Sequence, residues 1–332
     1  MPLRRPLVSI LVLAAALGAC TGERRAAGAP AADTAAAAPA LRIVATIGDS
    51  ASTIEGLAEH AGQLYTADWK DGAVYRVDPA TGTATKVGAL PLEPGTPILG
   101  LAADPAGNVY AAVPGAGVVY RIDAARLGAA DFDPARDARA FATGAAGANG
   151  VAIDLHGHLW ISGGDQNAVY HVGPEGGAVA PFAKGYASMA TDTTMPVRVY
   201  VTNGLGIDSK GAIHTANTGT GELIRIERKA GDAAGAISTV LADRRLLGLD
   251  GIIAVPGDTL YVTANFSNTI ARVDPSGAVT ILATDETGAV LRFPAELKRI
   301  GNTIYAANLN FPVGRNAGQT ARGATIAALT LP

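Results

Sequence analysis

The sequence contains a single cysteine in 332 residues, at position 20. One cysteine cannot form an intramolecular disulfide, so the fold must be held by its core rather than by a disulfide framework. Aromatic residues make up only 5% of the chain and charged residues 17%, with a formal net charge of −3. This slightly acidic balance has no basic footprint, and we expect no nucleic-acid partner.

The N-terminal segment lacks an apolar run long enough to span a bilayer. Arg4 and Arg5 precede an uncharged apolar stretch over residues 7–17. This stretch leads into the sequence LGAC at 17–20. This order is typical of a secretory signal. The last four residues resemble a bacterial lipobox, in which the cysteine is lipidated and becomes the mature N-terminus. The alternative is an ordinary signal peptide with an incidental cysteine.

The absence of any other cysteine favours lipidation of Cys20, because a free thiol would be a liability in an oxidising compartment. Residues 1–19 are predicted to be a lipoprotein signal peptide. Residues 20–40 are rich in Ala and Pro without apolar periodicity, and we interpret them as a flexible tether. We expect an exported monomer, anchored to a membrane of the bacterial cell envelope, whose folded domain covers residues 41–332.

Glycine, in contrast, is abundant, with 41 residues, as is typical of a chain with many tight turns. Six copies of one unit follow one another along the chain. Each copy reads as an apolar strand, a turn containing Gly or Asp, and a second strand. The copies cover residues 54–69, 99–113, 149–163, 203–217, 250–265 and 294–308.

Most copies are followed by two further strands. Third strands are predicted at 73–79, 118–124, 168–174, 222–228 and 269–275, and fourth strands at 83–89, 138–144, 178–184, 237–243 and 278–284. In the third strands, Arg76, Arg121 and Arg272 alternate with apolar residues and should face outward. Four short strands recurring about every 50 residues are the signature of a propeller blade. We therefore predict an all-β protein, a six-bladed β-propeller with four antiparallel strands per blade.

The sixth copy lacks an outer strand, because the chain ends after its third strand at 323–331. The segment 41–47 precedes the first copy and has no sheet of its own. Pairing these two segments would close the ring and remove two exposed sheet edges. We therefore expect the N-terminal strand to complete the last blade.

Four copies carry a polar residue where the innermost strand begins. The aligned positions are Glu55, Leu99, Asn149, Asn203, Asp250 and Pro294. Equivalent positions of successive blades form a ring around the axis, so the four polar side chains should converge. Two converging carboxylates are costly to bury without a counter-charge. Alternatively, Asn-Gly and Asp-Gly are only turn signals.

A divalent hard cation would supply that counter-charge, and all four residues offer oxygen atoms. Ca²⁺ accepts about six to eight oxygen ligands, which leaves positions for water or substrate. The set contains no His or Cys, which argues against zinc or copper. We therefore expect a Ca²⁺ site at the propeller axis.

This pattern resembles the gluconolactonase/regucalcin family and its relatives, the diisopropylfluorophosphatases and paraoxonase-like lactonases. Members bind a catalytic Ca²⁺ through Glu, Asn, Asn and Asp from the first, third, fourth and fifth blades. The resemblance covers residues 41–332 and implies that Glu55, Asn149, Asn203 and Asp250 are the metal ligands. It also implies hydrolysis of a lactone or related ester.

The chain departs from this family at two places. Sugar lactonases commonly carry Arg two residues before the third-blade Asn and Asp directly after it, whereas this chain has Gly147 and Gly150. Phosphotriesterase and paraoxonase types use a histidine near the metal, and the sixth copy contains none. The resemblance therefore does not extend to a polyhydroxy lactone as substrate.

Two functions follow from these residues. In a Ca²⁺-dependent hydrolase, the ion would polarise a carbonyl and stabilise the oxyanion. Asp250 would then act as general base or nucleophile. In a non-catalytic propeller of the NHL type, whose repeat these copies also resemble, the polar ring would be structural. Such a propeller would bind a protein, peptide or glycan on a broad exposed patch rather than in a closed pocket.

The loops between second and third strands share a face with the starts of the inner strands. They are predicted to line a small-molecule pocket through Trp69, Asp165, Asn217, Asn265, Phe266 and Asn308. Two longer segments, 185–198 and 309–322, project on the same face and could form a lid. These segments add Tyr186, Met189, Phe311 and Arg315 as candidate substrate contacts.

The lipoprotein interpretation predicts that Cys20→Ser abolishes membrane attachment without unfolding the domain, because nothing from residue 41 onward needs the thiol. Fractionation of cells expressing the variant measures attachment, and circular dichroism of the released protein measures folding. A variant that remains in the membrane fraction contradicts the interpretation.

Overall fold

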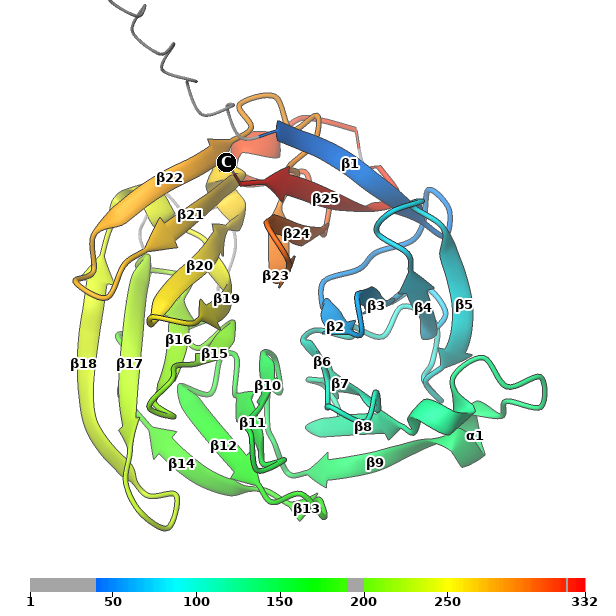
Figure 1. The fold of residues 1–332 in the computed structure, drawn as a ribbon, viewed down its shortest axis with the longest axis horizontal. Coiled ribbons are helices and arrows are strands. Elements are labelled where there is room, and N and C mark those ends of the chain that lie inside the picture. The colour runs from blue at the N-terminus through cyan, green and yellow to red at the C-terminus, as the bar shows by residue number, and fades with distance from the viewer. Residues whose placement is uncertain (1–39, 190–199, 321, 332) are drawn as a thin grey trace, which may run out of the picture. The chain divides into compact units, whose positions relative to one another are not determined.

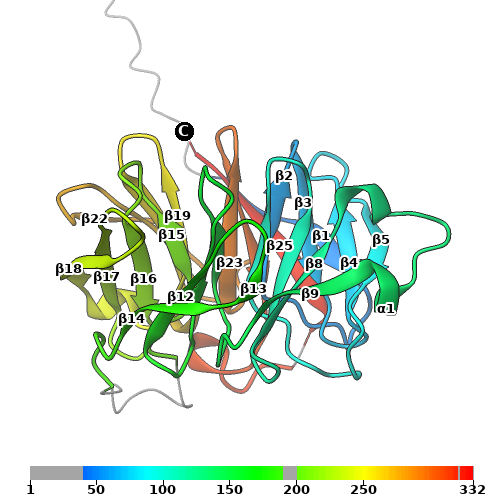
Figure 2. The same cartoon turned by 90° about the horizontal axis from the view of Figure 1, so that it is seen from below.

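The computed structural model describes residues 40–189, 200–320 and 322–331, in which nearly all regular structure is β-strand. Figure 1 shows six sheets arranged as blades around one axis, and Figure 2 shows their strands running between the two faces of the ring. The six-bladed propeller is therefore confirmed. The predicted signal peptide and all but the last residue of the tether lie outside the described residues. Where the chain is described, none of its helices is long and apolar enough to cross a membrane.

Each blade follows the repeat predicted from the sequence. Blade one comprises β2 (Ala58–His60), β3 (Gln63–Ala67), β4 (Ala73–Val77) and β5 (Ala84–Ala89). Blade two comprises β6 (Leu101–Ala103), β7 (Val109–Val113), β8 (Val118–Ile122) and β9 (Ala138–Thr143), with η1 (Ala124–Arg126) and α1 (Pro134–Asp137) between the last two. Blade three comprises β10 (Val151–Ile153), β11 (Leu159–Ser162), β12 (Ala168–Val172) and β14 (Ala180–Lys184).

The remaining three blades repeat this order. Blade four comprises β15 (Leu205–Ile207), β16 (Ile213–Asn217), β17 (Glu222–Arg228) and β18 (Ala234–Ala242), followed by η2 (Arg244–Leu246). Blade five comprises β19 (Leu249–Val255), β20 (Thr259–Ala264), η3 (Asn265–Ser267), β21 (Thr269–Val273) and β22 (Val279–Thr284). Blade six comprises β23 (Pro294–Ile300), β24 (Thr303–Asn308), η4 (Gly314–Asn316), β25 (Ala324–Thr330) and β1 (Ala40–Ile47).

One short strand departs from the predicted pattern. β13 (Gly177–Ala178) pairs in parallel with β9 at the edge of blade two, although it lies in the chain between the third and fourth strands of blade three. It therefore covers an outer edge that would otherwise be exposed.

The ring closes through β1 and β25, as predicted. The two strands are antiparallel, with Leu41 opposite Leu329 and Ile47 opposite Ala324, and one bulge near Ile43. Ile47 is completely buried, whereas Ile43 is 37% exposed. The first and last strands of the domain therefore belong to the same sheet, and both contribute side chains to the core.

The core lies between neighbouring blades. Tyr110 and Ala112 of blade two, for example, belong to the same buried cluster as Val151 and Leu159 of blade three. Comparable clusters join each of the other adjacent pairs of blades. Because both faces of a blade are covered, the second strands are buried along almost their whole length.

In several blades an aspartate begins the turn that follows the first or the third strand. Asp104, Asp154 and Asp208 each follow a first strand, and Asp274 follows a third strand. In each, one carboxylate oxygen accepts hydrogen bonds from the backbone N–H groups two and four residues later, at 2.8–3.0 Å. This local hydrogen bonding explains why Asp recurs in these turns.

The closure predicts that Ile47→Ala lowers the free energy of unfolding by about 2–5 kcal/mol, as for other large-to-small core substitutions. Ile43→Ala, on the exposed part of the same strand, should cost about 1 kcal/mol or less. Urea unfolding of the two variants measures the difference. An equal loss of unfolding free energy in both variants would mean that Ile47 of β1 is not part of the core.

Candidate active site

The starts of the inner strands converge on one cavity of about 290 Å³ at the propeller axis. Three of the four predicted metal ligands, Glu55, Asn203 and Asp250, line this cavity. The complete lining is Glu55, Trp69, Tyr200, Asn203, Thr218, Asp250, Asn265, Phe266, Phe293, Leu309, Phe311 and Val313. All four predicted ligands are buried, at 2–6% exposure.

The glycine after each polar residue is needed for this convergence. A Cβ atom on Gly56 would lie 2.1 Å from the carbonyl oxygen of Leu99, and one on Gly204 would lie 2.0 Å from that of Asp250. The same clash with the next blade would occur at Gly100, Gly150 and Gly251. None of these glycines has a positive φ. Their role is therefore close approach between blades rather than a turn.

The structure corrects the alignment of the sixth copy by one residue. The ring position of blade six is held by Ala295, whose carbonyl faces Gly251, rather than by Pro294. Glu296 consequently stands where the other five blades have glycine, and its backbone N–H donates to the carbonyl oxygen of Glu55 at 3.4 Å. The turn between β23 and β24 is one residue shorter than the equivalent turn of blade five, since Ile300 pairs with Thr303 and Val255 with Thr259, and this difference accounts for the shift.

Asn149 belongs to the ring but does not line the cavity. Its backbone N–H donates to the Ser162 carbonyl and its carbonyl accepts from Gly100, each at 2.9 Å. Its side chain is buried, and the Nδ2 atom has no hydrogen-bond partner among the described residues. Asn149 therefore occupies the predicted blade position with an unsatisfied amide.

The two cavity carboxylates are buried without a cation. Neither Glu55 nor Asp250 forms an ion pair within the described part of the chain. Burial raises the pKa of Glu55 well above its usual range, and the charges of Asp250 and Glu296 raise it further. Two nearby buried carboxylates thus favour the protonated form of at least one of them.

Asp250 is held by hydrogen bonds. Its Oδ2 atom accepts from Nδ2 of Asn265 at 2.9 Å. Burial raises the pKa of Asp250 to about 7, with Asn265 lowering it, Glu296 raising it and Asn203 lowering it in decreasing order. Asn203 itself donates from Nδ2 to Thr218 at 3.0 Å, which leaves its Oδ1 without a partner in the described residues.

Glu296 was not anticipated as part of the site. It is 5% exposed, and burial raises its pKa, although Nζ of Lys298 lies 3.1 Å from its Oε1. In a correct alignment of the six copies, Glu296 occupies the position that is glycine in the other five, and this exception could have identified it. Aligning the sixth copy on Pro294 placed Ala295 at that position instead.

Aromatic side chains form the wall above the carboxylates. Trp69 meets Phe311 edge to face, with ring centroids 6.0 Å apart, and Phe293 packs against Phe266 and Phe311 at 5.2 Å and 5.5 Å. The indole N–H of Trp69 donates to the carbonyl of Ile98 at 2.6 Å, which fixes the ring. The predicted pocket residues Trp69, Asn265 and Phe266 therefore share one cavity with the acidic pair.

The other predicted pocket residues lie elsewhere. Asn308 is fully buried and bonds to the backbone of Arg292 and Val290, and Asn217 bonds to the carbonyl of Ser188. Asp165 is half-buried in the β11–β12 loop. Arg315, in η4, forms an ion pair with Glu286. None of these four side chains lines the axial cavity.

The two predicted lid segments differ in what they contribute. Leu309, Phe311 and Val313, from the segment 309–322, line the cavity. The segment 185–198 is described only as far as Met189, which is 62% exposed, and its remaining residues lie outside the described part of the chain. Asn167 holds the described part through hydrogen bonds to the backbone of Ala187.

Solved structures with the same architecture include several enzymes and a calcium-binding protein. The calcium-binding protein regucalcin from Agrobacterium tumefaciens is 15% identical, with a TM-score of 0.63 over 89% of this chain and 96% of that one. A gluconolactonase from Xanthomonas campestris is 15% identical, with a TM-score of 0.62 over 89% and 90%. Virginiamycin B lyase from Staphylococcus aureus is 14% identical, with a TM-score of 0.56 over 89% and 100%.

The chain has the propeller fold of these proteins. The resemblance to gluconolactonase and regucalcin drawn from the sequence is thus confirmed at the level of fold. No family model and no curated protein sequence matches the chain. At such low identity the likeness establishes the architecture alone, and the chemistry must be argued from the axial residues.

The raised pKa of Asp250 predicts a pH dependence of stability in the presence of a chelator. A carboxyl whose pKa is raised by folding stabilises the fold below its unfolded pKa, and this contribution is lost as the pH rises toward the folded pKa. Between about pH 4 and about pH 7 the wild type should therefore lose stability relative to Asp250→Asn, by on the order of a few kcal/mol.

Urea unfolding across this range measures the effect. Asp243→Asn is the control, because its pairing with Arg245 lowers the pKa of Asp243, so this group titrates below the range and its difference from the wild type should stay nearly constant. A constant difference between wild type and Asp250→Asn would show that Asp250 is not protonated in the fold.

Proposed function

We propose that the protein is a calcium-dependent hydrolase of a lactone or a related ester, with the ion at the axial cavity. The observation that carries this proposal is that two buried carboxylates, Glu55 and Asp250, neither paired with a basic side chain among the described residues, line a pocket large enough for a small molecule. Burying two unpaired carboxylates costs free energy of folding, so such a pair indicates a cation-binding or catalytic role.

The donor atoms fit a hard divalent cation. Glu55 and Asp250 supply carboxylate oxygens, and Asn203, which lines the same cavity, has an Oδ1 atom without a hydrogen-bond partner among the described residues. Asn149 holds the ring position of blade three but does not line the cavity, so its amide oxygen would add a fourth ligand only if its side chain turned toward the cavity. An all-oxygen set favours Ca²⁺ over zinc or copper.

Bound Ca²⁺ would supply Lewis-acid polarisation of a carbonyl group. Asp250 is the residue best placed to accept a proton from water, because its ordinary acidity is weakened by burial and its Oδ2 is oriented by Asn265. Glu55 and Asn203 would hold the ion. Glu296, paired with Lys298, adds negative charge below them.

The pocket wall favours an apolar substrate. Four aromatic residues line the cavity, and no arginine or lysine does so within the described residues; the four are Trp69, Phe266, Phe293 and Phe311. An aryl or alkyl substituent would pack against these rings and exclude water from the carboxylates. We therefore propose an apolar lactone or aryl ester rather than a sugar lactone.

The comparisons support this choice without deciding it. Regucalcin is described as a calcium-binding protein and another neighbour as a gluconolactonase, but a lyase shares the same fold. The axial residues favour a hydrolase over a non-catalytic propeller of the NHL type, because they line a walled cavity instead of a broad patch. We also propose that Cys20 anchors the enzyme to a membrane of the cell envelope, where it would act as a monomer.

Glu55→Gln should weaken Ca²⁺ binding by at least about tenfold, because it keeps the shape and one oxygen but removes one of two balancing charges. Calorimetry measures the affinity, and thermal unfolding should show a smaller Ca²⁺-dependent stabilisation. Glu59→Gln is the matched control, since Glu59 lies in β2, four residues after Glu55, and lines a different cavity. No Ca²⁺ binding to the wild type would overturn the metal assignment.

Asp250→Asn should retain weakened Ca²⁺ binding and lose turnover by roughly 10²–10⁴-fold, as when an acid–base group is removed. The assay is hydrolysis of a panel of apolar lactones and aryl esters at saturating Ca²⁺. Equal rates for variant and wild type would mean that Asp250 acts only as a ligand.

A further inference from the structure

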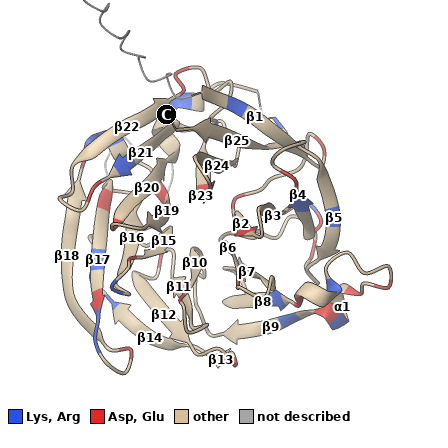
Figure 3. Cartoon of the chain, viewed as in Figure 1, with Lys and Arg blue, Asp and Glu red and all other residues tan. Residues whose placement is uncertain are grey.

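At one register position, blade three and blade six, where Ala328 lies opposite Tyr305, lack a residue that the other four blades share. The third strand carries an arginine opposite the second-strand residue 65, 110, 214 or 261 in four blades; these arginines are Arg76, Arg121, Arg225 and Arg272. In blade three the equivalent residue, opposite Trp160, is His171. Figure 3 shows basic residues on β4, β8, β17 and β21 and none on β12.

A second histidine and an aspartate meet His171 at this point. The Nε2 atom of His171 lies 2.7 Å from Nδ1 of His158, which directly precedes β11. Oδ2 of Asp232, from the β17–β18 turn of blade four, lies 3.3 Å from His158 Nδ1 and 3.6 Å from His171 Nε2. It is the only such convergence of three or more His, Cys, Asp or Glu ligand atoms in the part of the chain that the structure describes.

These separations suit a transition-metal ion. Zinc binds imidazole nitrogen and carboxylate oxygen at about 2.0–2.2 Å, so neighbouring ligand atoms on a tetrahedral ion are roughly 3.3–3.5 Å apart. The two distances from Asp232, 3.3 Å and 3.6 Å, match that value, and the 2.7 Å hydrogen bond between the two imidazoles would lengthen as both nitrogens bind the ion. We propose that His158, His171 and Asp232 form a site for Zn²⁺ or a similar divalent transition metal, separate from the axial cavity.

Neighbouring side chains hold the three ligands in place. Arg228 Nε lies 3.6 Å from Oδ1 of Asp232, which leaves Oδ2 directed at the histidines. Asp154 accepts a hydrogen bond from the backbone of His158 at 3.0 Å and pairs with Arg228 at 2.6 Å. The ring of Trp160 lies 4.4 Å from that of His171. Supporting contacts of this kind orient the ligands of known metal sites.

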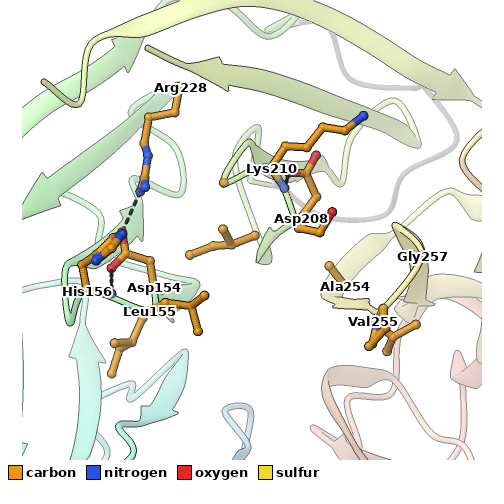
Figure 4. A pocket seen from close by; sticks show the side chains of 14 residues that line it. Asp154, Leu155, His156, Asp208, Lys210, Arg228, Ala254, Val255 and Gly257 are labelled. Carbon is orange, nitrogen blue, oxygen red and sulfur yellow. Dashed lines mark hydrogen bonds and ion pairs between the residues drawn. The ribbon is translucent and has the colours of Figure 1, made fainter. Parts of the chain in front are cut away.

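The site is accessible to an ion from solution. All three ligand residues are partly exposed, and three protein ligands leave a fourth position for water or another donor. Asp154 and Arg228 also line a cavity of about 630 Å³ between the turns of blades three, four and five, where Figure 4 shows their ion pair at the rim. The ion would therefore join blade three to blade four beside this cavity.

The two proposed metal sites differ in donor chemistry, which makes them separable. The axial residues offer only oxygen atoms and suit Ca²⁺, whereas two imidazole nitrogens select against it. Excess Ca²⁺ can therefore fill the axial site while Zn²⁺ is titrated. Nothing in this proposal depends on the hydrolase function.

The test is calorimetric titration of chelator-stripped, full-length protein with Zn²⁺ in the presence of excess Ca²⁺. We expect binding of one Zn²⁺ to the wild type. The variants His158→Gln and Asp232→Asn should weaken it by at least the roughly 10–100-fold that even supporting residues contribute. His171→Arg places at this register the residue that four other blades carry, so it tests the site with a side chain the repeat already accommodates.

His156→Gln is the matched control, because His156 is exposed two residues from His158 and is not among the three ligands. Co²⁺, which is paramagnetic, should quench the fluorescence of Trp160 in a Trp69→Phe background, and His171→Arg should remove the quenching. Absence of Zn²⁺ binding, or binding that survives both His158→Gln and His171→Arg, overturns the proposal. Equal loss in His156→Gln and His158→Gln overturns the ligand assignment.

Discussion

The close approach of the inner strands at the axis is the constraint on which the rest of the structure depends. Five blades meet it with glycine, because a Cβ atom would collide with the carbonyl of the next blade. The residues before these glycines therefore form a ring. Glu55, Asn203 and Asp250 of this ring line one buried cavity, where the negative charge must be neutralised.

The boundary between blade six and blade one, where the ring closes, is the one place where glycine is not found at this position. Blade six is completed by β1, and at the boundary with blade one the glycine position holds Glu296 instead. A third acidic group thus enters the axis next to Glu55 and raises its pKa. The order of the chain, which places the closure between the last and first blades, also places the most acidic part of the site there.

The repeat was sufficient to predict the blades, their strand order and the closing pair, because apolar periodicity and turn residues are local signals. It also predicted that Glu55, Asn203 and Asp250 converge, since ring positions follow from symmetry. Among the loop side chains that line the cavity, it identified Trp69, Asn265 and Phe266 but not Phe293 or Val313. Asn308 and Asn217 serve the backbone of neighbouring loops, whereas Phe293 and Val313 form the wall, and these directions depend on tertiary packing. Glu296 stayed concealed because the β23–β24 turn is one residue shorter than its equivalent in blade five, which shifts the sequence alignment by one position.

The central claim is that the acidic axis exists to bind a cation. Calorimetric titration of chelator-treated protein with Ca²⁺ near pH 7, in two buffers of different ionisation enthalpy, measures binding and proton release together. The account predicts binding with net release of protons, because the carboxyls of Glu55 and Asp250 are partly protonated without the ion. No binding, or binding whose heat does not depend on the buffer, would contradict it.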